Sequence, residues 1–124
     1  MDWAAEAEPS QLSTGQRKLV GVARALVARP TLLCLDEPAA GLDTSESEEL
    51  GVALRRLADG GQSMLLIEHD MGLVLSICDR VVVLELGRVI AEGPPEVVRQ
   101  DPRVIAAYLG DGLTHETADT AETT

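Results

Sequence analysis

The stretch TLLCLDEPAAGLD, residues 31–43, sets an apolar run directly before two adjacent acids, Asp36 and Glu37. The uncharged run from Thr31 to Leu35 is typical of a strand that is buried on both faces of a parallel sheet. In open parallel sheets, ligands bind beyond the carboxyl ends of the strands, where these two acids lie. One carboxylate can hold a metal ion while the other faces the reacting group. Acids also end strands simply because the next loop is solvated, so this stretch alone leaves both interpretations open.

Helices alternate with strands along the rest of the chain, which predicts an α/β fold with a parallel sheet. Apolar residues recur at three- and four-residue intervals before Pro30 and again after Asp43, which can cap the second helix together with Glu46. We expect strands at 31–35, 63–67 and 81–84, a return strand at 88–91 that closes a hairpin, and helices at 15–28, 44–58, 71–77, 95–99 and 102–108.

Composition argues against several classes of protein. The 124 residues carry a net charge of −11, which opposes a phosphate backbone, so we expect no nucleic-acid partner. No apolar stretch approaches the roughly 20 residues of a membrane span, and the acidic N-terminus does not resemble a signal peptide. Cys34 and Cys78 each lie among apolar neighbours, which suits buried free thiols in a reducing compartment better than a disulfide or a zinc site. These features indicate a soluble, cytoplasmic chain.

Two shorter motifs could add binding groups. LSTGQ, residues 12–16, opens the first helix, where free N–H groups and the positive end of the helix dipole favour an anion. Ser and Thr also begin helices as ordinary caps, so this motif is weak on its own. LLIEHD, residues 65–70, places His69 after the second strand, where a neutral imidazole could hydrogen-bond a phosphate oxygen or a water. Taken singly, His69 is more simply interpreted as a surface-loop histidine.

Taken together, in this order and at these separations, the motifs resemble those of the ATPase subunits of ABC transporters. LSTGQ resembles the signature motif, TLLCLDEP the Walker B motif, AGLD the D-loop, and IEHD the segment with the switch histidine. The resemblance runs from about Leu12 to Gly110. Within that family, LDEPAAGLD, LLIEHDMGLV and VIAAYLG look most like the subunits that energise branched-chain amino-acid uptake.

The resemblance implies a role for each matching residue. Asp36 would orient Mg²⁺, Glu37 would polarise the attacking water, and His69 would contact the γ-phosphate of ATP. Asp43 would communicate across a dimer with a second ABC ATPase subunit, identical or different. The γ-phosphate bound by that partner would be capped by the signature residues Ser13, Thr14, Gly15 and Gln16. Thr14 stands where glycine is commoner in the family, and its extra bulk could weaken the fit.

The phosphate loop of the family, G-x-x-x-x-G-K-[ST], does not occur in these 124 residues, whose only lysine, Lys18, lies inside the first predicted helix. We therefore interpret the chain as the C-terminal half of an ATPase subunit. Alone it is not expected to be a competent enzyme, because positioning supplies most of phosphoryl-transfer catalysis. The alternative is a non-catalytic binding module that docks on a complete ABC ATPase and presents the signature motif in trans. An ABC protein that acts on DNA is disfavoured by the charge.

The implied fold is α/β, an incomplete P-loop-type three-layer sheet that lacks the strand leading into the phosphate loop. That strand would lie between 63–67 and 81–84. We therefore expect 31–35 to pair in parallel with 63–67, and 63–67 to share no ladder with 81–84.

Three segments are expected along the chain: a polar lead-in over 1–11, the ATPase half over 12–110, and a disordered acidic tail over 111–124. The resemblance also implies transmembrane permease subunits as partners. The assembled chain would then lie in the cytoplasm, on the inner face of the cell membrane. ATP and Mg²⁺ would bind only together with the missing half or a partner subunit.

Overall fold

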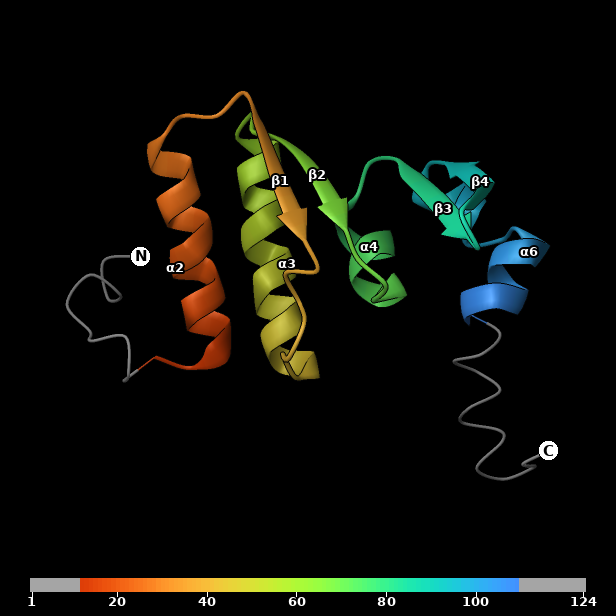
Figure 1. Cartoon of the computed structure of the whole chain (residues 1–124), viewed down its shortest axis with the longest axis horizontal. Helices are drawn as coiled ribbons and strands as arrows, with labels where there is room; N and C mark the ends of the chain where they lie inside the picture. Colours follow the sequence, from red (N-terminus) through yellow and green to blue (C-terminus); the bar gives the residue numbers. More distant parts are fainter. Residues whose placement is uncertain (1–11, 110–124) are drawn as a thin grey trace. The chain divides into compact units, whose positions relative to one another are not determined.

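The computed structural model describes residues 12–109, which divide into two units, the first ending at Leu73 and the second beginning at Val74. The first unit contains, in order, α2 (Thr14–Val27), β1 (Leu32–Asp36), α3 (Thr44–Asp59) and β2 (Ser63–Ile67) (Figure 1). The helix α4 (Met71–Ile77) spans the division. These elements confirm the predicted ranges to within one residue at each end. The predicted lead-in and tail lie outside the described residues.

The first unit is built around a parallel β-α-β arrangement. Strands β1 and β2 pair in parallel, with Leu32 opposite Ser63 and Asp36 opposite Ile67. Two parallel strands need a long crossover connection, and α3 provides it. Figure 1 shows α2 and α3 running alongside each other in the same direction, so that both begin at the end of the unit where β1 and β2 finish. The predicted parallel pairing is therefore confirmed.

The core of the first unit lies on the inner side of its helices. Leu50 and Leu54, four residues apart and hence on one face of α3, are each only 1% exposed. Val22 of α2 and Leu33 of β1 are also buried. These four apolar side chains come from three elements, so two helices and a strand contribute to the core of this unit.

The other face of the β1–β2 pair is exposed. Four apolar residues of the two strands are exposed: Leu32, Cys34, Leu65 and Ile67. On β1, Leu33 lies between Leu32 and Cys34 and is buried. Successive side chains of a strand point to opposite faces, and only one face of this sheet is covered within the unit. The prediction that the 31–35 strand is buried on both faces is therefore wrong. The predicted burial of the thiols is also wrong, since Cys34 is exposed and Cys78 half-buried, although neither cysteine forms a disulfide within residues 12–109.

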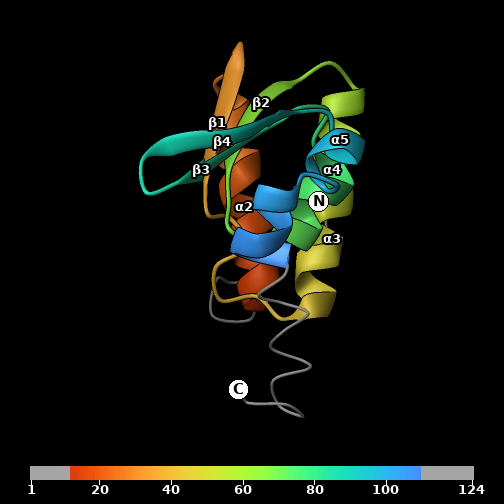
Figure 2. The same ribbon diagram turned by 90° about the vertical axis from the view of Figure 1, so that its right-hand side faces the viewer.

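The second unit opens with the hairpin of β3 (Val81–Glu85) and β4 (Arg88–Gly93), which is drawn in teal in Figure 2. Leu86 and Gly87 have φ values of 50° and 79°, the left-handed pair of a type I′ hairpin turn. The predicted hairpin is therefore confirmed. The short helices α5 (Pro95–Val98) and α6 (Pro102–Val104) contact β4. The buried apolar side chains of these elements come from the strands (Val81, Val83 and Ala91) and from the helices (Val98 and Val104).

The end of the second unit differs from the prediction of a helix at 102–108. The helix α6 is capped by Asp101, whose Oδ1 accepts the N–H of Arg103, but Ile105–Leu109 continue as the π-helix η2. The hydroxyl of Tyr108 donates a hydrogen bond to the carbonyl of Leu84 and so ties this turn to β3.

Strands β2 and β3 belong to separate two-stranded sheets within residues 12–109, as predicted from the missing strand.

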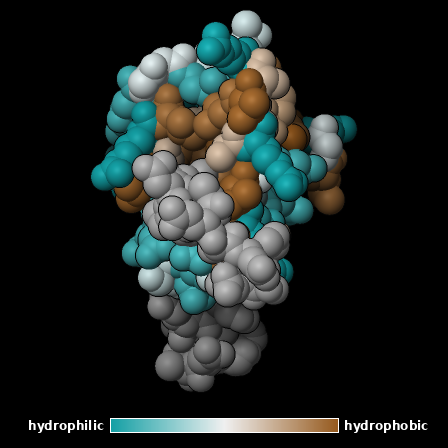
Figure 3. Space-filling view, turned by 90° about the vertical axis from the view of Figure 1, so that its left-hand side faces the viewer, coloured by the Kyte–Doolittle hydropathy of each residue, from teal (hydrophilic) through white to brown (hydrophobic). Residues whose placement is uncertain are grey.

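Among the helices of residues 12–109, none has both the length and the apolar character needed to cross a bilayer. Seen from the α2 side, apolar atoms gather on the upper part of the surface (Figure 3), and Val27 at the end of α2 is 81% exposed.

Candidate functional site

The two acids of the Walker B-like stretch occupy the carboxyl end of β1. Asp36 is the last residue of the strand and Glu37 the first of the loop. Glu37 has a φ of 47°, in the left-handed region that non-glycine residues rarely adopt. Its N–H donates to the carbonyl of Ile67 at 2.7 Å, which holds the start of this loop against the end of β2. Backbone conformations of this kind cost about 1–3 kcal/mol and cluster at functional sites.

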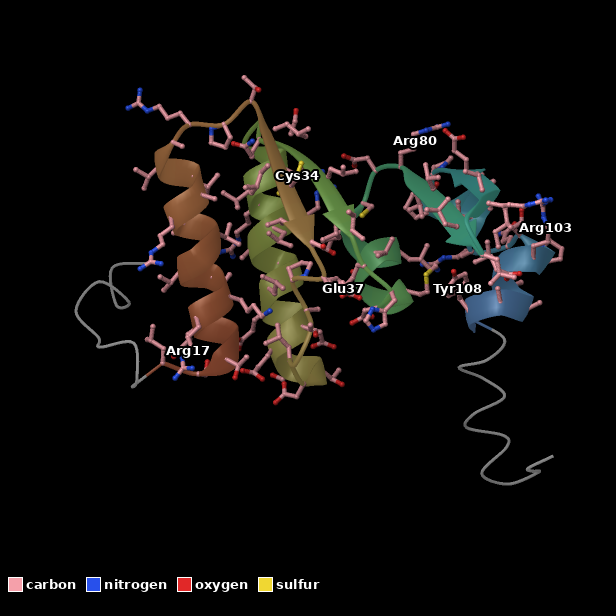
Figure 4. The ribbon with its side chains drawn as sticks, viewed as in Figure 1. Arg17, Cys34, Glu37, Arg80, Arg103 and Tyr108 are labelled. Atoms are coloured by element: carbon pink, nitrogen blue, oxygen red, sulfur yellow. The ribbon has the colours of Figure 1, made fainter. Side chains whose placement is uncertain are left out.

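The carboxylate of Glu37 faces the imidazole of His69. Glu37 Oε1 lies 3.0 Å from His69 Nδ1, and both side chains are more than half exposed. Each residue follows the carboxyl end of a strand, β1 or β2, and these strands are neighbours. Parallel pairing therefore brings His69 beside Glu37, which is labelled in Figure 4.

Glu68 completes this cluster and was not predicted from the sequence. Its side chain is only 1% exposed. Its Oε2 accepts the N–H of Ala39 at 3.0 Å, and its Oε1 accepts the N–H of His69 at 3.1 Å. The sequence did contain a signal for the burial of this side chain. Period-two alternation along β2 places Glu68 on the same side as Met64 and Leu66, which are less exposed than their neighbours.

The signature-like motif forms the capped start of α2. The N–H of Gln16 donates to Ser13 Oγ at 3.1 Å, and Gln16 Oε1 accepts the N–H of Ser13 at 3.0 Å. This is a reciprocal capping box. Ser13 and Thr14 are exposed. The ordinary capping role that the sequence left open is therefore present, and the exposed residues remain accessible to a ligand.

Glu46 joins the signature-like motif to the D-loop-like segment. Its Oε1 accepts the N–H of Asp43 at 3.3 Å, while Asp43 Oδ1 accepts the N–H of Glu46 at 2.8 Å. Its Oε2 accepts the N–H of Gly15 at 3.0 Å. A Cβ at Gly15 would lie 3.1 Å from that oxygen, so only glycine fits there without displacing Glu46. The sequence identified Glu46 only as a cap of its own helix.

The Glu46→Ala substitution is expected to lower the free energy of unfolding by about 1–3 kcal/mol, because it removes one cap and leaves the N–H groups of Gly15 and Asp43 without their acceptor. Thermal unfolding followed by circular dichroism measures this loss. Glu48→Ala, at an exposed position two residues along the same helix, is the matched control and should change stability by no more than about 0.5 kcal/mol. Equal effects of the two substitutions would show that the Glu46 bonds do not stabilise the chain.

Asp36 is the one residue predicted as a metal ligand. Within residues 12–109, no three His, Cys, Asp or Glu side chains converge as a metal-binding group. Mg²⁺ is commonly held by one or two carboxylates together with phosphate oxygens of a nucleotide. An exposed carboxylate at the end of a parallel strand, beside Glu37, fits that mode of binding.

Two family models match the chain. The model described as "ABC transporter" matches residues 2–40, and the one described as "Branched-chain amino acid ATP-binding cassette transporter" matches residues 88–114. Among curated proteins, the chain is 46% identical over 101 residues to the high-affinity branched-chain amino acid transport ATP-binding protein BraF of Pseudomonas aeruginosa, covering 81% of this chain and 40% of BraF. It is 44% identical over 108 residues to the corresponding protein LivG of Escherichia coli K12, covering 86% of this chain and 42% of LivG.

The fold is similar to that of solved ATP-binding cassettes. The structure of the ADP conformation of MJ1267, an ATP-binding cassette of an ABC transporter, aligns with a TM-score of 0.71 and 36% identity, over 81% of this chain and 41% of that one. The predicted resemblance to the ATP-binding subunits of ABC transporters, and to their branched-chain amino-acid type, is therefore confirmed, as is the α/β fold class. The chain spans about two fifths of the length of the curated relatives it matches.

Proposed function

We propose that this chain is the C-terminal portion of the ATP-hydrolysing subunit of an ABC importer for branched-chain or other hydrophobic amino acids. The observation that carries the proposal is the 3.0 Å approach of Glu37 Oε1 to His69 Nδ1 at the carboxyl ends of two paired parallel strands. That edge of a parallel sheet is where ligands bind. The similarity to BraF and LivG supports the class of solute.

Three residues at this edge of the sheet have a chemical task in the proposed reaction: Glu37, His69 and Asp36. Glu37 accepts a hydrogen bond from the attacking water and so turns its oxygen toward the γ-phosphorus. His69 hydrogen-bonds the γ-phosphate beside Glu37. Asp36 would hold Mg²⁺, whose charge would offset that of the phosphate oxygens. Positioning and charge stabilisation dominate phosphoryl transfer, so these groups need a phosphate cradle that residues 1–124 do not contain.

The start of α2 and Asp43 are proposed to serve a second ATPase subunit. The γ-phosphate that the partner binds is capped by Ser13, Thr14, Gly15 and Gln16. Asp43 contacts the partner across the dimer. The N–H of Gly15 already bonds to Glu46. A phosphate oxygen could take this N–H only if Glu46 released it, whereas the exposed hydroxyl groups of Ser13 and Thr14 need no such change.

The isolated 124-residue chain is expected to show no measurable ATP binding or turnover at millimolar ATP, because it lacks the lysine and glycine cradle. Isothermal calorimetry with Mg-ATP tests this. The positive control is a chimera that joins the N-terminal part of BraF, as far as its signature motif, to this chain from Leu12 onward. Stoichiometric ATP binding by the isolated chain would contradict the proposal, and so would a folded chimera that neither binds nor hydrolyses ATP.

A second candidate function is a non-catalytic module that docks on a complete ABC ATPase and offers LSTGQ in trans. The exposed Ser13 and Thr14 at the start of α2 favour it. The two candidates differ in a mixing experiment. A module should raise the ATPase rate of a complete subunit whose own signature serine is replaced, whereas a fragment of a subunit should not. The DNA upstream of Met1 offers an independent test, because a Walker A coding sequence there supports the first candidate.

The proposed assembly contains two ATPase subunits and transmembrane permease subunits, with the chain on the inner face of the cell membrane. ATP and Mg²⁺ are its cofactors, bound only together with the cradle of the N-terminal half or of a partner subunit.

A further inference from the structure

Glu68 is only half-buried as a whole residue, but its side chain is withdrawn from solvent within an otherwise exposed cluster. Its side chain is 1% exposed, whereas those of Glu37 and His69 are 52% and 72% exposed. Withdrawing a carboxylate from water is unfavourable unless hydrogen bonds replace the lost hydration. Glu68 has such bonds, and both come from backbone N–H groups of the loops that carry the candidate catalytic residues.

The two oxygens of Glu68 serve different loops. Oε2 accepts the N–H of Ala39, two residues beyond Glu37 in the loop after β1. Oε1 accepts the N–H of His69 in the loop after β2, and it also lies 3.6 Å from His69 Nδ1. One side chain therefore connects the loop of the proposed water-activating acid to the loop of the proposed phosphate-sensing histidine. Its second contact with His69 is to the same ring nitrogen that faces Glu37.

We propose that Glu68 is a positioning residue for Glu37 and His69, an inference that rests on the proposed ATPase function. Its carboxylate fixes the separation of the two loops and turns Nδ1 of His69 toward the carboxylates, which leaves Nε2 as the ring nitrogen available to a phosphate oxygen. Hydrogen bonds to a charged acceptor are stronger than neutral ones, so a carboxylate is suited to hold two backbone groups at once.

Amide hydrogen exchange, measured by NMR on the 124-residue chain, tests the connection between the loops without any nucleotide. Glu68→Ala removes the acceptor of the Ala39 N–H and should speed exchange at Ala39 and His69 at least about tenfold. Glu49→Ala, at an exposed position on α3, should leave both rates unchanged. Unchanged exchange at Ala39 in Glu68→Ala, with amides of β1 and β2 still protected, would overturn the proposal.

Turnover by the BraF chimera separates positioning from mere stabilisation. Glu68→Gln keeps the size of the side chain but loses the charged acceptor, and Glu68→Asp keeps the charge but is too short to reach both loops. Each should lower kcat per folded molecule at least about tenfold, while KM for ATP stays within about twofold and Glu49→Gln behaves as wild type. A purely structural role would lower the melting temperature and the folded fraction but leave kcat per folded molecule intact, and that result would overturn the proposal.

The hydrogen-exchange and turnover experiments together distinguish failure of this inference from failure of the proposed function. If the unsubstituted chimera hydrolyses no ATP, the proposed function fails, and the exchange rates at Ala39 still decide whether Glu68 connects the loops. If the chimera is active and the Glu68 variants match it, only the inference about Glu68 fails.

Discussion

Replacing Glu37 by glutamine is expected to slow ATP hydrolysis by the BraF chimera roughly 10²–10⁴-fold, or about 3–5 kcal/mol of activation free energy. Glutamine keeps the length of the side chain and can still hydrogen-bond a water, but its neutral carbonyl cannot accept the proton. ATP binding should change little, because Asp36 remains to serve Mg²⁺. Because glutamine has nearly the same size as glutamate, its side-chain amide can occupy the position 3.0 Å from His69 Nδ1 without displacing the imidazole.

Single-turnover ATPase measurements with a parallel nucleotide-binding assay check both parts of this expectation. Glu49→Gln makes the same chemical change at an exposed position of α3 and should leave the rate within about twofold of the unsubstituted chimera. Near-normal hydrolysis by Glu37→Gln would remove Glu37 from the proposed role of water activation. A variant that also lost ATP binding would instead assign Glu37 to the binding of nucleotide or metal.

The helices and strands could be predicted because their limits are encoded locally. Asp43 and Glu46 form the capping box that begins α3, and Asp70 Oδ1 accepts the N–H of Leu73 at the start of α4. Leu86 and Gly87 close the β3–β4 hairpin. Each of these signals needs only residues close in sequence, so none depends on the rest of the domain. The parallel pairing of β1 with β2 was implied by the resemblance to ABC ATPases, and the long helical connection between the two strands is compatible with it.

Burial could not be predicted in the same way. The apolar run at β1 was interpreted as a strand covered on both faces, yet Leu32 and Cys34 are exposed. Hydrophobicity shows that a residue is suited to burial, but exposure depends on whether another element covers it. In the described first unit only one face of the β1–β2 pair is covered, so Leu33 is buried while its apolar neighbours Leu32 and Cys34 are not.

Of the candidate site, Glu37 and His69 were predicted from the sequence, but the residues that connect the loops were not. Motif order indicated Glu37 and His69, and strand pairing brings them together. Glu68 and Glu46 were missed as connecting residues because each bonds to a backbone group about thirty residues away, Ala39 and Gly15 respectively. Backbone acceptors and donors are present at every position, so nothing in the sequence marks which of them a distant carboxylate will meet.

Leu54→Ala is expected to destabilise the first unit by about 2–5 kcal/mol, because it removes a branched side chain that is 1% exposed and leaves a cavity beside Leu50. A unit of roughly 60 residues has a total stability of only about 3–9 kcal/mol at ~0.05–0.15 kcal/mol per residue. The substitution should therefore lower the melting temperature by at least about 10 °C, or leave the unit unfolded at room temperature. Urea unfolding monitored by circular dichroism measures the change.

The matched control lies on the same helix. Val52 is 54% exposed, and Val52→Ala should change stability by less than about 1 kcal/mol, with a small gain from the higher helix propensity of alanine. A large difference between the two substitutions is expected only if α3 packs through the face that carries Leu50 and Leu54. If Leu54→Ala unfolded at the same urea concentration as Val52→Ala, that face would not be the core. The stability of the first unit would then have to come from packing on another face of α3 or from other elements.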